Sequence, residues 1–189
     1  MHYERTDEYQ QVLDLLHVES PRLLFVTGSA GTGKSTLIDV LRAELDRNLV
    51  VVAPTGVAAL NVRGQTIHSF FQLPPGPQPR ARRIQGSGRD VIAKMDVLVI
   101  DEVSMVRADL LDAVDDALRA NTGRPNVPFG GKAVVLIGDM HQLPPVIAGS
   151  EERRLFESSY ESPYFFSALC LARQPLTAVT LTRSFRQPD

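Results

Sequence analysis

Short apolar runs alternate along the chain with segments whose apolar residues recur at helical spacing. The runs lie at 23–26, 49–53, 97–100, 133–137 and 176–181. Continuous β-branched runs of this length are typical of parallel strands that are buried on both faces. Segments 6–17, 36–45 and 107–120 carry apolar residues three or four positions apart and predict helices. The alternation predicts an α/β three-layer sandwich with a mostly parallel central sheet.

Two stretches outside the predicted strands carry several charged residues. The stretch 72–90 is rich in proline and glycine and also carries Arg80, Arg82, Arg83 and Arg89. A solvated loop is the simpler interpretation, and a basic flap over a polyanion is the alternative. In the helix expected at 107–120, four aspartates are predicted to form a solvated face opposite the apolar one. They are Asp109, Asp112, Asp115 and Asp116.

A glycine-rich stretch joins the first apolar run to the helix that follows it. It reads Gly28-Ser29-Ala30-Gly31-Thr32-Gly33-Lys34-Ser35, with Thr36 next. This order fits the phosphate-loop pattern in the strand-to-helix context that the pattern requires. Glycines allow several backbone N–H groups to turn inward toward anionic oxygens, and the helix N-terminus adds to this effect. We expect Lys34 to bind the outer phosphates of a nucleoside triphosphate and the Ser35 hydroxyl to bind Mg²⁺.

Polar residues follow three other predicted strands. The run at 97–100 ends in Asp101-Glu102, which resembles a Walker B element: Asp101 would hold Mg²⁺ and Glu102 would activate the attacking water. The run at 133–137 leads to Gln142, which could reach a terminal phosphate, although a turn closed by prolines is the alternative. The run at 49–53 leads into a polar stretch where open α/β sheets bind ligands. Taken singly, His68 is more often structural and Phe71 more often core.

Composition sets limits on the class of protein. A length of 189 residues fits one domain with at most a small extension. No apolar run approaches the roughly 20 residues of a membrane span, and the polar N-terminus argues against a signal peptide. Cys170 is the single cysteine, which excludes an internal disulfide and suggests a reducing, intracellular setting. The net charge of −2 counts mildly against a nucleic-acid partner, although basic charge can be local.

Taken together, these stretches resemble the Pif family of superfamily 1 helicases. Residues 28–35 resemble motif I, 100–106 motif II, 138–146 motif III, and 185–189 the beginning of motif IV. Motif Ia is matched by Ala-Pro-Thr-Gly-Val-Ala-Ala-Leu-Asn-Val at 53–62, followed by Gly64, Thr66, Ile67, His68 and Ser69. Motif I is generic, whereas motifs Ia and III together are specific to the family.

The resemblance implies a role for each matching position. Gln10 would contact adenine, Glu102 would be the catalytic base, Gln142 would sense the γ-phosphate, and Arg186 would be an arginine finger. Lys34 would act in both binding and catalysis. ATP would be bound through Gly28, Ala30, Gly31, Thr32, Gly33, Lys34, Ser35 and Thr36, and Mg²⁺ through Ser35 and Asp101. The single-stranded DNA path would be lined by Thr55, Gly56, Asn61, Thr66, His68 and Ser69, with Phe71 as a base-stacking residue.

The family also implies an activity and its partners. Residues 1–189 would form the N-terminal RecA-like P-loop ATPase lobe of a 5′–3′ DNA helicase acting in repair, recombination and telomere maintenance. Its partners would be ATP, Mg²⁺, and single-stranded and forked or structured DNA. Such helicases hold ATP between two RecA-like lobes, and the second lobe is absent from this sequence. We therefore expect a fragment, or a subunit that pairs with another, with weak or no hydrolysis alone.

Other interpretations remain open at this point. Another P-loop NTPase or a small-molecule kinase would use the same phosphate loop, and a non-catalytic nucleic-acid-binding module would keep it as a scaffold. We expect a monomer in the cytoplasm, associated with the nucleoid in a bacterium, or in the nucleus or mitochondrion of a eukaryote.

Overall fold

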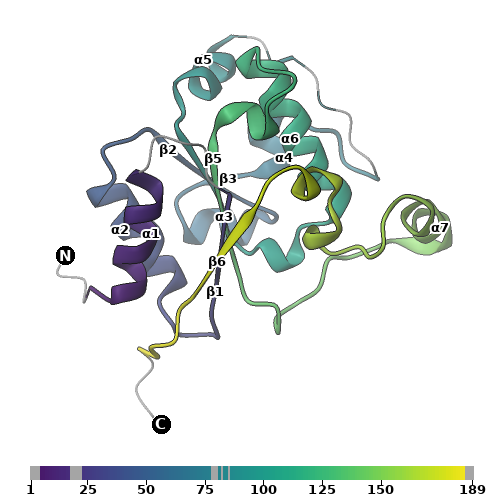
Figure 1. The fold of residues 1–189 in the computed structure, drawn as a ribbon. Helices are drawn as coiled ribbons and strands as arrows, with labels where there is room; N and C mark the ends of the chain where they lie inside the picture. The colour runs from purple at the N-terminus through teal and green to yellow at the C-terminus, as the bar shows by residue number, and fades with distance from the viewer. Residues whose placement is uncertain (1–4, 18–22, 78–80, 82, 85, 186–189) are drawn as a thin grey trace.

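The structure is a computed structural model that describes residues 5–17, 23–77, 81, 83–84 and 86–185. Within these residues, six strands form one parallel sheet in the order β3-β2-β4-β5-β1-β6 (Figure 1). The strands are β1 (Leu23–Thr27), β2 (Leu49–Ala53), β3 (Gln65–Thr66), β4 (Val97–Ile100), β5 (Ala133–Gly138) and β6 (Leu176–Thr180). The predicted α/β fold with a parallel sheet is confirmed.

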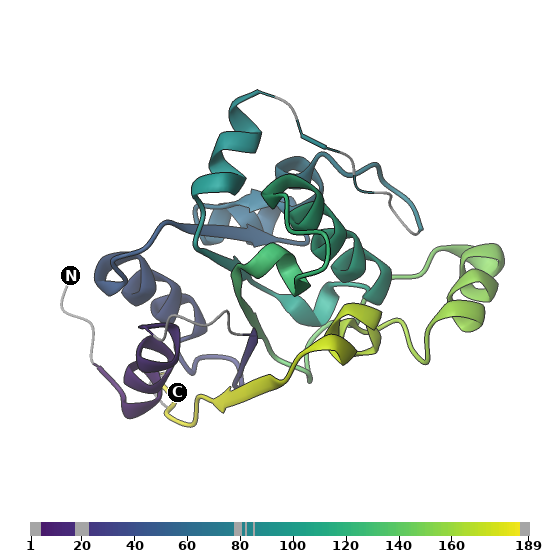
Figure 2. The same cartoon turned by 45° about the horizontal axis from the view of Figure 1, so that its top comes forward.

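Helices lie on both faces of this sheet. They are α1 (Asp7–His17), α2 (Lys34–Glu44), α3 (Gly56–Asn61), α4 (Ile67–Phe71), α5 (Ser87–Lys94), α6 (Ala108–Thr122) and α7 (Gly149–Ser159). Short 3₁₀ turns are η1 (Val103–Met105), η2 (Pro128–Gly131), η3 (Phe165–Ser167) and η4 (Leu169–Arg173). Figures 1 and 2 show α1 and α2 on one side, α5 and α6 on the other, and α7 at the periphery.

The core divides into two layers because alternate residues of each strand point to opposite faces of the sheet. In β4, Leu98 and Ile100 pack with α4, α5 and α6, whereas Val97 and Val99 pack with α1 and α2. All four residues of this strand are fully buried. This two-sided burial explains why the apolar runs are continuous rather than alternating.

Several elements were not predicted, including α4 and the short 3₁₀ turns. β3 has only two residues, which is too short to leave a periodic pattern. The expected loop at 72–90 ends early because α5 begins at Ser87. α7 begins at Gly149 and ends at Ser159 in a stretch without a strong apolar stripe, and Phe156 is its one core residue among those whose side chains are described. Within the described part of the chain, no helix is both long and apolar enough to cross a membrane.

The prediction that the aspartates of α6 form a solvated face is wrong for three of the four. Asp109 and Asp115 are each only 2% exposed. Asp112 accepts hydrogen bonds from the Leu169 and Cys170 N–H groups and from the Tyr160 hydroxyl. These carboxylates attach later parts of the chain to α6, and the side chain of Asp116 alone of the four is mostly exposed.

Candidate functional site

The glycine-rich loop between β1 and α2 has a backbone that only glycine tolerates at key points. Gly31 and Gly33 have φ values of +83° and +86°, in the left-handed region that disfavours residues with a Cβ. A Cβ on Gly33 would lie 2.1 Å from Tyr9 Oη, and one on Gly28 would lie 2.4 Å from Thr32 Oγ1. The loop therefore has the curled backbone that the sequence pattern predicts.

Segments far away in the sequence hold this loop in place. The Tyr9 hydroxyl donates to the Gly33 carbonyl at 2.8 Å, and the Phe185 N–H donates to the Gly31 carbonyl at 2.9 Å. The Leu181 N–H donates to the Thr27 carbonyl at the end of β1. Neither Tyr9 nor Phe185 was predicted as a site residue. Tyr9 lies in an apolar stripe, where an aromatic residue looks like ordinary core, and Phe185 acts through its backbone N–H.

Lys34 lies at the start of α2, and its ammonium group folds over the loop. Its Nζ donates to the Gly28 carbonyl at 2.7 Å and to the Ser29 carbonyl at 3.0 Å. Of the remaining predicted phosphate-binding positions, Thr32 is buried, Thr36 is half-buried, and Ala30 and Ser35 are exposed. The structure thus brings a full positive charge and the open side of a phosphate loop together.

A buried carboxylate stands opposite this lysine at the end of β4. Asp101 is 6% exposed, and burial raises its pKa to about 6; the Glu102 N–H and Lys34 lower the pKa, and the Glu102 charge raises it. Such a group is stabilised in its ionised form by a nearby cation. Glu102 follows with φ of +50°, a conformation uncommon for residues other than glycine and often found at functional sites.

The donor set fits a magnesium ion that is shared with a nucleotide. Mg²⁺ is usually held by one or two protein oxygens, with phosphates and waters completing the octahedron. Ser35 and Asp101 offer one hydroxyl and one carboxylate. Among the described residues there is no group of three or more His, Cys, Asp or Glu side chains that could hold a metal by themselves.

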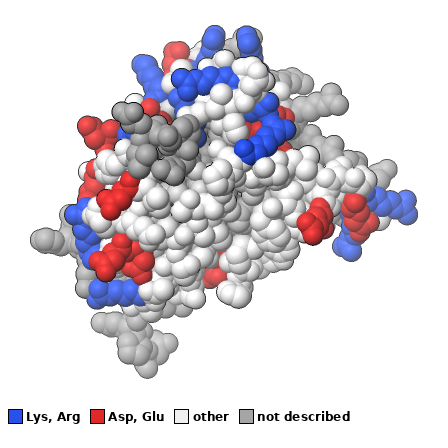
Figure 3. All heavy atoms as spheres, viewed as in Figure 1, with Lys and Arg blue, Asp and Glu red and all other residues white. Residues whose placement is uncertain are grey.

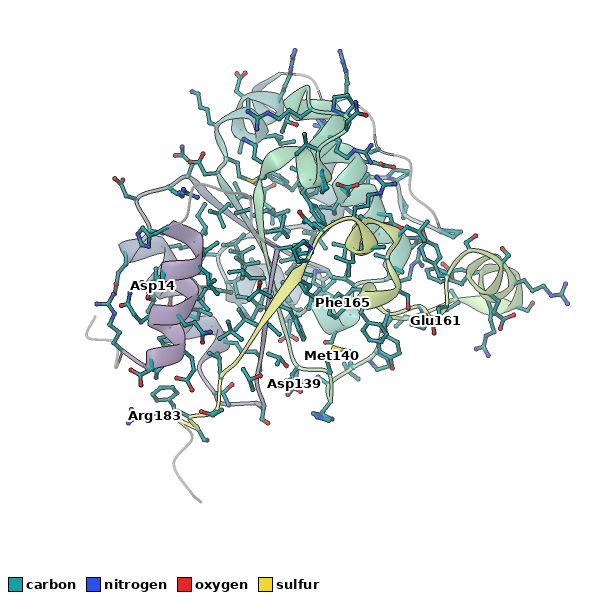
Figure 4. The ribbon with its side chains drawn as sticks, in the orientation of Figure 1. Asp14, Asp139, Met140, Glu161, Phe165 and Arg183 are labelled. Carbon is teal, nitrogen blue, oxygen red and sulfur yellow. The ribbon has the colours of Figure 1, made fainter. Side chains whose placement is uncertain are left out.

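Gln142 is positioned by a residue for which no role was predicted. Asp139, 5% exposed at the end of β5, accepts the Gln142 Nε2–H at 3.1 Å and the His141 N–H at 3.0 Å. Burial alone would raise the Asp139 pKa, but these bonds together with Lys34 lower it, so the carboxylate stays ionised. Figure 4 labels Asp139 and Arg183 in the lower half of the molecule, beyond the ends of β5 and β6.

Two further residues, Gln10 and Arg186, were predicted to contact the nucleotide. Gln10 is in α1, one residue after the tyrosine that bonds to Gly33, and its Nε2 donates to Asp14 Oδ1 at 2.7 Å. It lines a shallow hollow of about 420 Å³ on the outer side of α1. Arg186 lies outside the described residues.

The predicted DNA path begins where β2 and β3 end. Thr55 and Thr66 cap the following helices, their hydroxyls accepting the Ala58 and Ser69 N–H groups at 3.2 Å each. Gly56, Asn61 and Ser69 are exposed on the same segment.

Thr55 and His68 line a shared hollow of about 290 Å³ together with Arg107. Burial and the Arg107 charge lower the pKa of His68. Arg107 donates to the Gly76 carbonyl at 2.8 Å and pairs with Asp109, so part of its charge is compensated.

The prediction that Phe71 stacks on a base is not supported. Its side chain is 1% exposed and meets Phe70 edge to face, with ring centroids 4.8 Å apart and an interplanar angle of 89°. Phe71 belongs to the core beneath α4 because it lies four residues after Ile67, on the same buried face of that short helix. A buried ring offers no face to a base.

The comparisons with known proteins agree on one family. The model of the PIF1-like helicase family matches residues 1–188. The chain is similar to the ATP-dependent DNA helicase PIF1 of Emericella nidulans, with 38% identity over 187 residues, and to that of Homo sapiens, with 36% identity over 185 residues. These alignments cover 91% and 95% of this chain, but 24% and 27% of the relatives.

Solved structures agree in fold. A Bacteroides Pif1 bound to single-stranded DNA superposes with a TM-score of 0.91 at 39% identity, and one in complex with ADP-AlF4 with a TM-score of 0.90 at 39% identity. Each comparison covers 100% of this chain and 44% of the solved chain. The chain thus spans about a quarter of the curated relatives' length and less than half of the solved chains.

Proposed function

Because the chain belongs to the PIF1-like helicase family, we propose that residues 1–189 form the N-terminal RecA-like ATPase lobe of a 5′–3′ DNA helicase. One observation carries the proposal. The glycine loop, Asp101-Glu102, Gln142 and the Thr55–His68 hollow all follow the carboxyl ends of strands in one parallel sheet. A nucleotide site and a nucleic-acid path would therefore share one edge of the sheet, the edge at which open α/β sheets bind ligands.

The nucleotide half of the proposal assigns one task to each group. Lys34 neutralises the β- and γ-phosphates that displace its contacts to the loop carbonyls. Ser35 and Asp101 hold Mg²⁺, which when bound adds further positive charge to the phosphates. Glu102 orients the attacking water and accepts its proton. Gln142, held by Asp139, contacts the γ-phosphate.

Two further groups complete the nucleotide proposal. Gln10 contacts adenine from the helix that touches the phosphate loop through Tyr9. Arg186 directly follows Phe185, whose N–H bonds to the loop, and serves as the arginine finger. Fingers of this kind contribute about 10³–10⁵ in rate in enzymes that have one.

The DNA half of the proposal uses the other residues at this edge. Thr55, Gly56, Asn61, Thr66, His68 and Ser69 contact backbone phosphates, which fixes position without reading sequence. Structures of relatives are described as bound to single-stranded DNA and at forked double-stranded DNA, which supports these partners. A second RecA-like lobe would close over the nucleotide, and the chain would act as a monomer.

The test is the affinity of the chain for Mg-ATP, measured with and without a single-stranded oligo-dT. If the two sites are coupled, DNA changes the nucleotide affinity and the nucleotide changes the DNA affinity by the same factor. Lys34→Ala should abolish nucleotide binding, whereas Lys94→Ala, an exposed lysine on α5, should leave it unchanged. Glu102→Gln should preserve binding and remove whatever turnover the chain has.

Other outcomes would favour the alternatives. Tight nucleotide binding that ignores DNA, with phosphoryl transfer to a small acceptor, would indicate a kinase. DNA binding without nucleotide binding would indicate a non-catalytic module. Either result would refute the helicase-lobe proposal.

A further inference from the structure

A second hollow lies at the opposite end of the sheet, where the strands begin. It has a volume of about 600 Å³, and its described lining includes five cationic side chains, which come from α5 and from three connections. They are Arg47, Arg83, Arg89, Arg124 and Lys132. Figure 3 shows Lys and Arg side chains gathered at the top of the molecule, the end at which Figure 1 places α5. We call this feature the basic hollow.

Acidic groups compensate little of this charge. Asp96 is the one acidic residue among the described residues of the lining, and its carboxylate already accepts hydrogen bonds from the N–H and side-chain amide of Asn48. No arginine of the basic hollow forms an ion pair with a described residue. The whole chain has a net charge of −2, so the basic hollow is a local exception and not a general property of the surface.

The fold holds these cations close to one another. A Cβ on Gly131 would lie 2.7 Å from Arg124 Nη1, so the Arg124 guanidinium packs directly on this glycine. Lys132 Nζ donates to the Ala93 carbonyl at 3.0 Å. Burial lowers the pKa of Lys132, and the Arg124 charge lowers it further, while Asp96 opposes both. Arg124 and Lys132 are therefore near enough to repel each other, a cost that a bound anion would relieve.

We propose that the basic hollow binds the phosphate backbone of single-stranded DNA at a second place on this lobe, apart from the Thr55–His68 hollow. Guanidinium groups match phosphate oxygens with paired N–H donors. The part of the lining that the structure describes contains no aromatic side chain, so it suits the backbone and not the bases. Arg83 lies in the arginine-bearing stretch that leads into α5, and Arg89 lies in the first turn of that helix.

The choice of DNA as the polyanion rests on the proposed function. The strands that separate the two hollows are four to six residues long in the centre of the sheet. At about 3.3 Å per residue this is roughly 13–20 Å, a distance that a strand longer than a few nucleotides can cover. One DNA strand would then contact both ends of the lobe.

The test compares two double variants with the same change of charge. Arg89→Glu with Arg124→Glu alters the basic hollow, and Arg153→Glu with Arg154→Glu alters two exposed arginines on α7. Binding of an oligo-dT of about 30 nucleotides, long enough for more than one site of typical size, is followed by fluorescence anisotropy as salt is raised. Thermal unfolding checks that each variant folds, and Arg89→Gln with Arg124→Gln provides a milder form.

We expect the basic-hollow variant to bind roughly tenfold more weakly at low salt and to lose about 1.4 from the slope of log K against log salt, since each lost contact to a single strand removes about 0.7. The α7 variant should keep the wild-type slope. An equal loss in both variants, or no loss in the basic-hollow variant, would overturn the proposal. So would a basic-hollow variant that loses binding of polyglutamate but not of DNA, because the partner would then be an acidic protein.

The basic-hollow variant also distinguishes a failure of this inference from a failure of the proposed function. At saturating DNA, the basic-hollow variant should still show the DNA-dependent change in Mg-ATP affinity, since that change arises at the other end of the sheet. If the basic-hollow variant has a smaller salt slope but the wild-type chain shows no nucleotide coupling, the helicase-lobe proposal alone would be refuted. Coupling with an unchanged slope would refute the basic hollow alone.

Discussion

Replacing Asp115 by alanine should destabilise the chain far more than replacing its neighbour Asp116. Asp115 Oδ1 accepts the N–H of the fully buried Phe129, and Oδ2 lies 3.2 Å from Arg119 Nη1. The Asp115 side chain is 2% exposed, whereas that of Asp116 is 66% exposed. The two residues are adjacent and chemically identical, so the comparison isolates burial and bonding.

The expected magnitude follows from the groups that lose their partners. A buried N–H without an acceptor costs roughly 1–3 kcal/mol, and breaking a buried ion pair costs roughly 3–5 kcal/mol. Arg119 is 22% exposed and keeps the Pro125 carbonyl and Asp116 as partners, so the ion-pair loss is smaller here. The helix propensity of alanine offsets up to about 0.7 kcal/mol. We expect a net loss of about 2–4 kcal/mol for Asp115→Ala.

Thermal and urea unfolding measure this loss. For a chain of this size, about 2–4 kcal/mol corresponds to a fall in Tm of about 4–16 °C. Asp115→Asn keeps an acceptor for the Phe129 N–H and should fall between the alanine variant and wild type. Asp116→Ala should stay within about 0.5 kcal/mol, as expected for an exposed site. Equal, small shifts for the alanine variants of both positions would refute the burial argument.

Three further predictions concern the phosphate loop, acid stability and a buried hydroxyl. Gly33→Ala should weaken nucleotide binding more than about tenfold by calorimetry, because its Cβ would clash with Tyr9 Oη at a positive φ. Hydrogen bonds from Thr182 lower the pKa of Glu8 from its ordinary 4.5 to about 2. This stabilisation is complete above pH 4.5 and is lost as the pH falls toward 2, so Glu8→Gln should flatten acid unfolding in that window when followed by circular dichroism. Ser104→Ala should leave the urea midpoint unchanged or raise it, since the buried Ser104 hydroxyl has no partner among the described residues; a clear fall would reveal a bond to this hydroxyl.

The parts of the fold that depend on local pattern were predictable from sequence. β4 is buried on both faces, so its apolar run is continuous, and the glycine loop needs its glycines at the positions where φ is positive. Both features leave a direct trace in the residue order. The polar positions at strand ends could be placed at one edge because all strands of the sheet run parallel.

The errors arise where distant segments meet. Nothing local in the sequence shows that Asp112 would accept the N–H groups of Leu169 and Cys170, more than fifty residues later. The same holds for Asp139, whose role depends on the turn that returns Gln142 to it. Phe71 was assigned to the DNA path by family position, but tertiary packing decides which of two adjacent aromatic residues is buried. The clustering of arginines from α5 and from separate connections likewise becomes visible only in three dimensions.

The hydrogen bonds that hold the phosphate loop have a consequence for how the chain reaches its native state. The loop at Gly31 and Gly33 is tied to α1 through Tyr9 and to the last described residues through Phe185. The contact between Thr182 and Glu8 closes a span of 174 residues. Contacts of such sequence separation form late, because their loop-closure entropy must be overcome first. Competence to bind a nucleotide would therefore be among the last properties to return on refolding, and a bound nucleotide would report that both ends of the chain have been assembled.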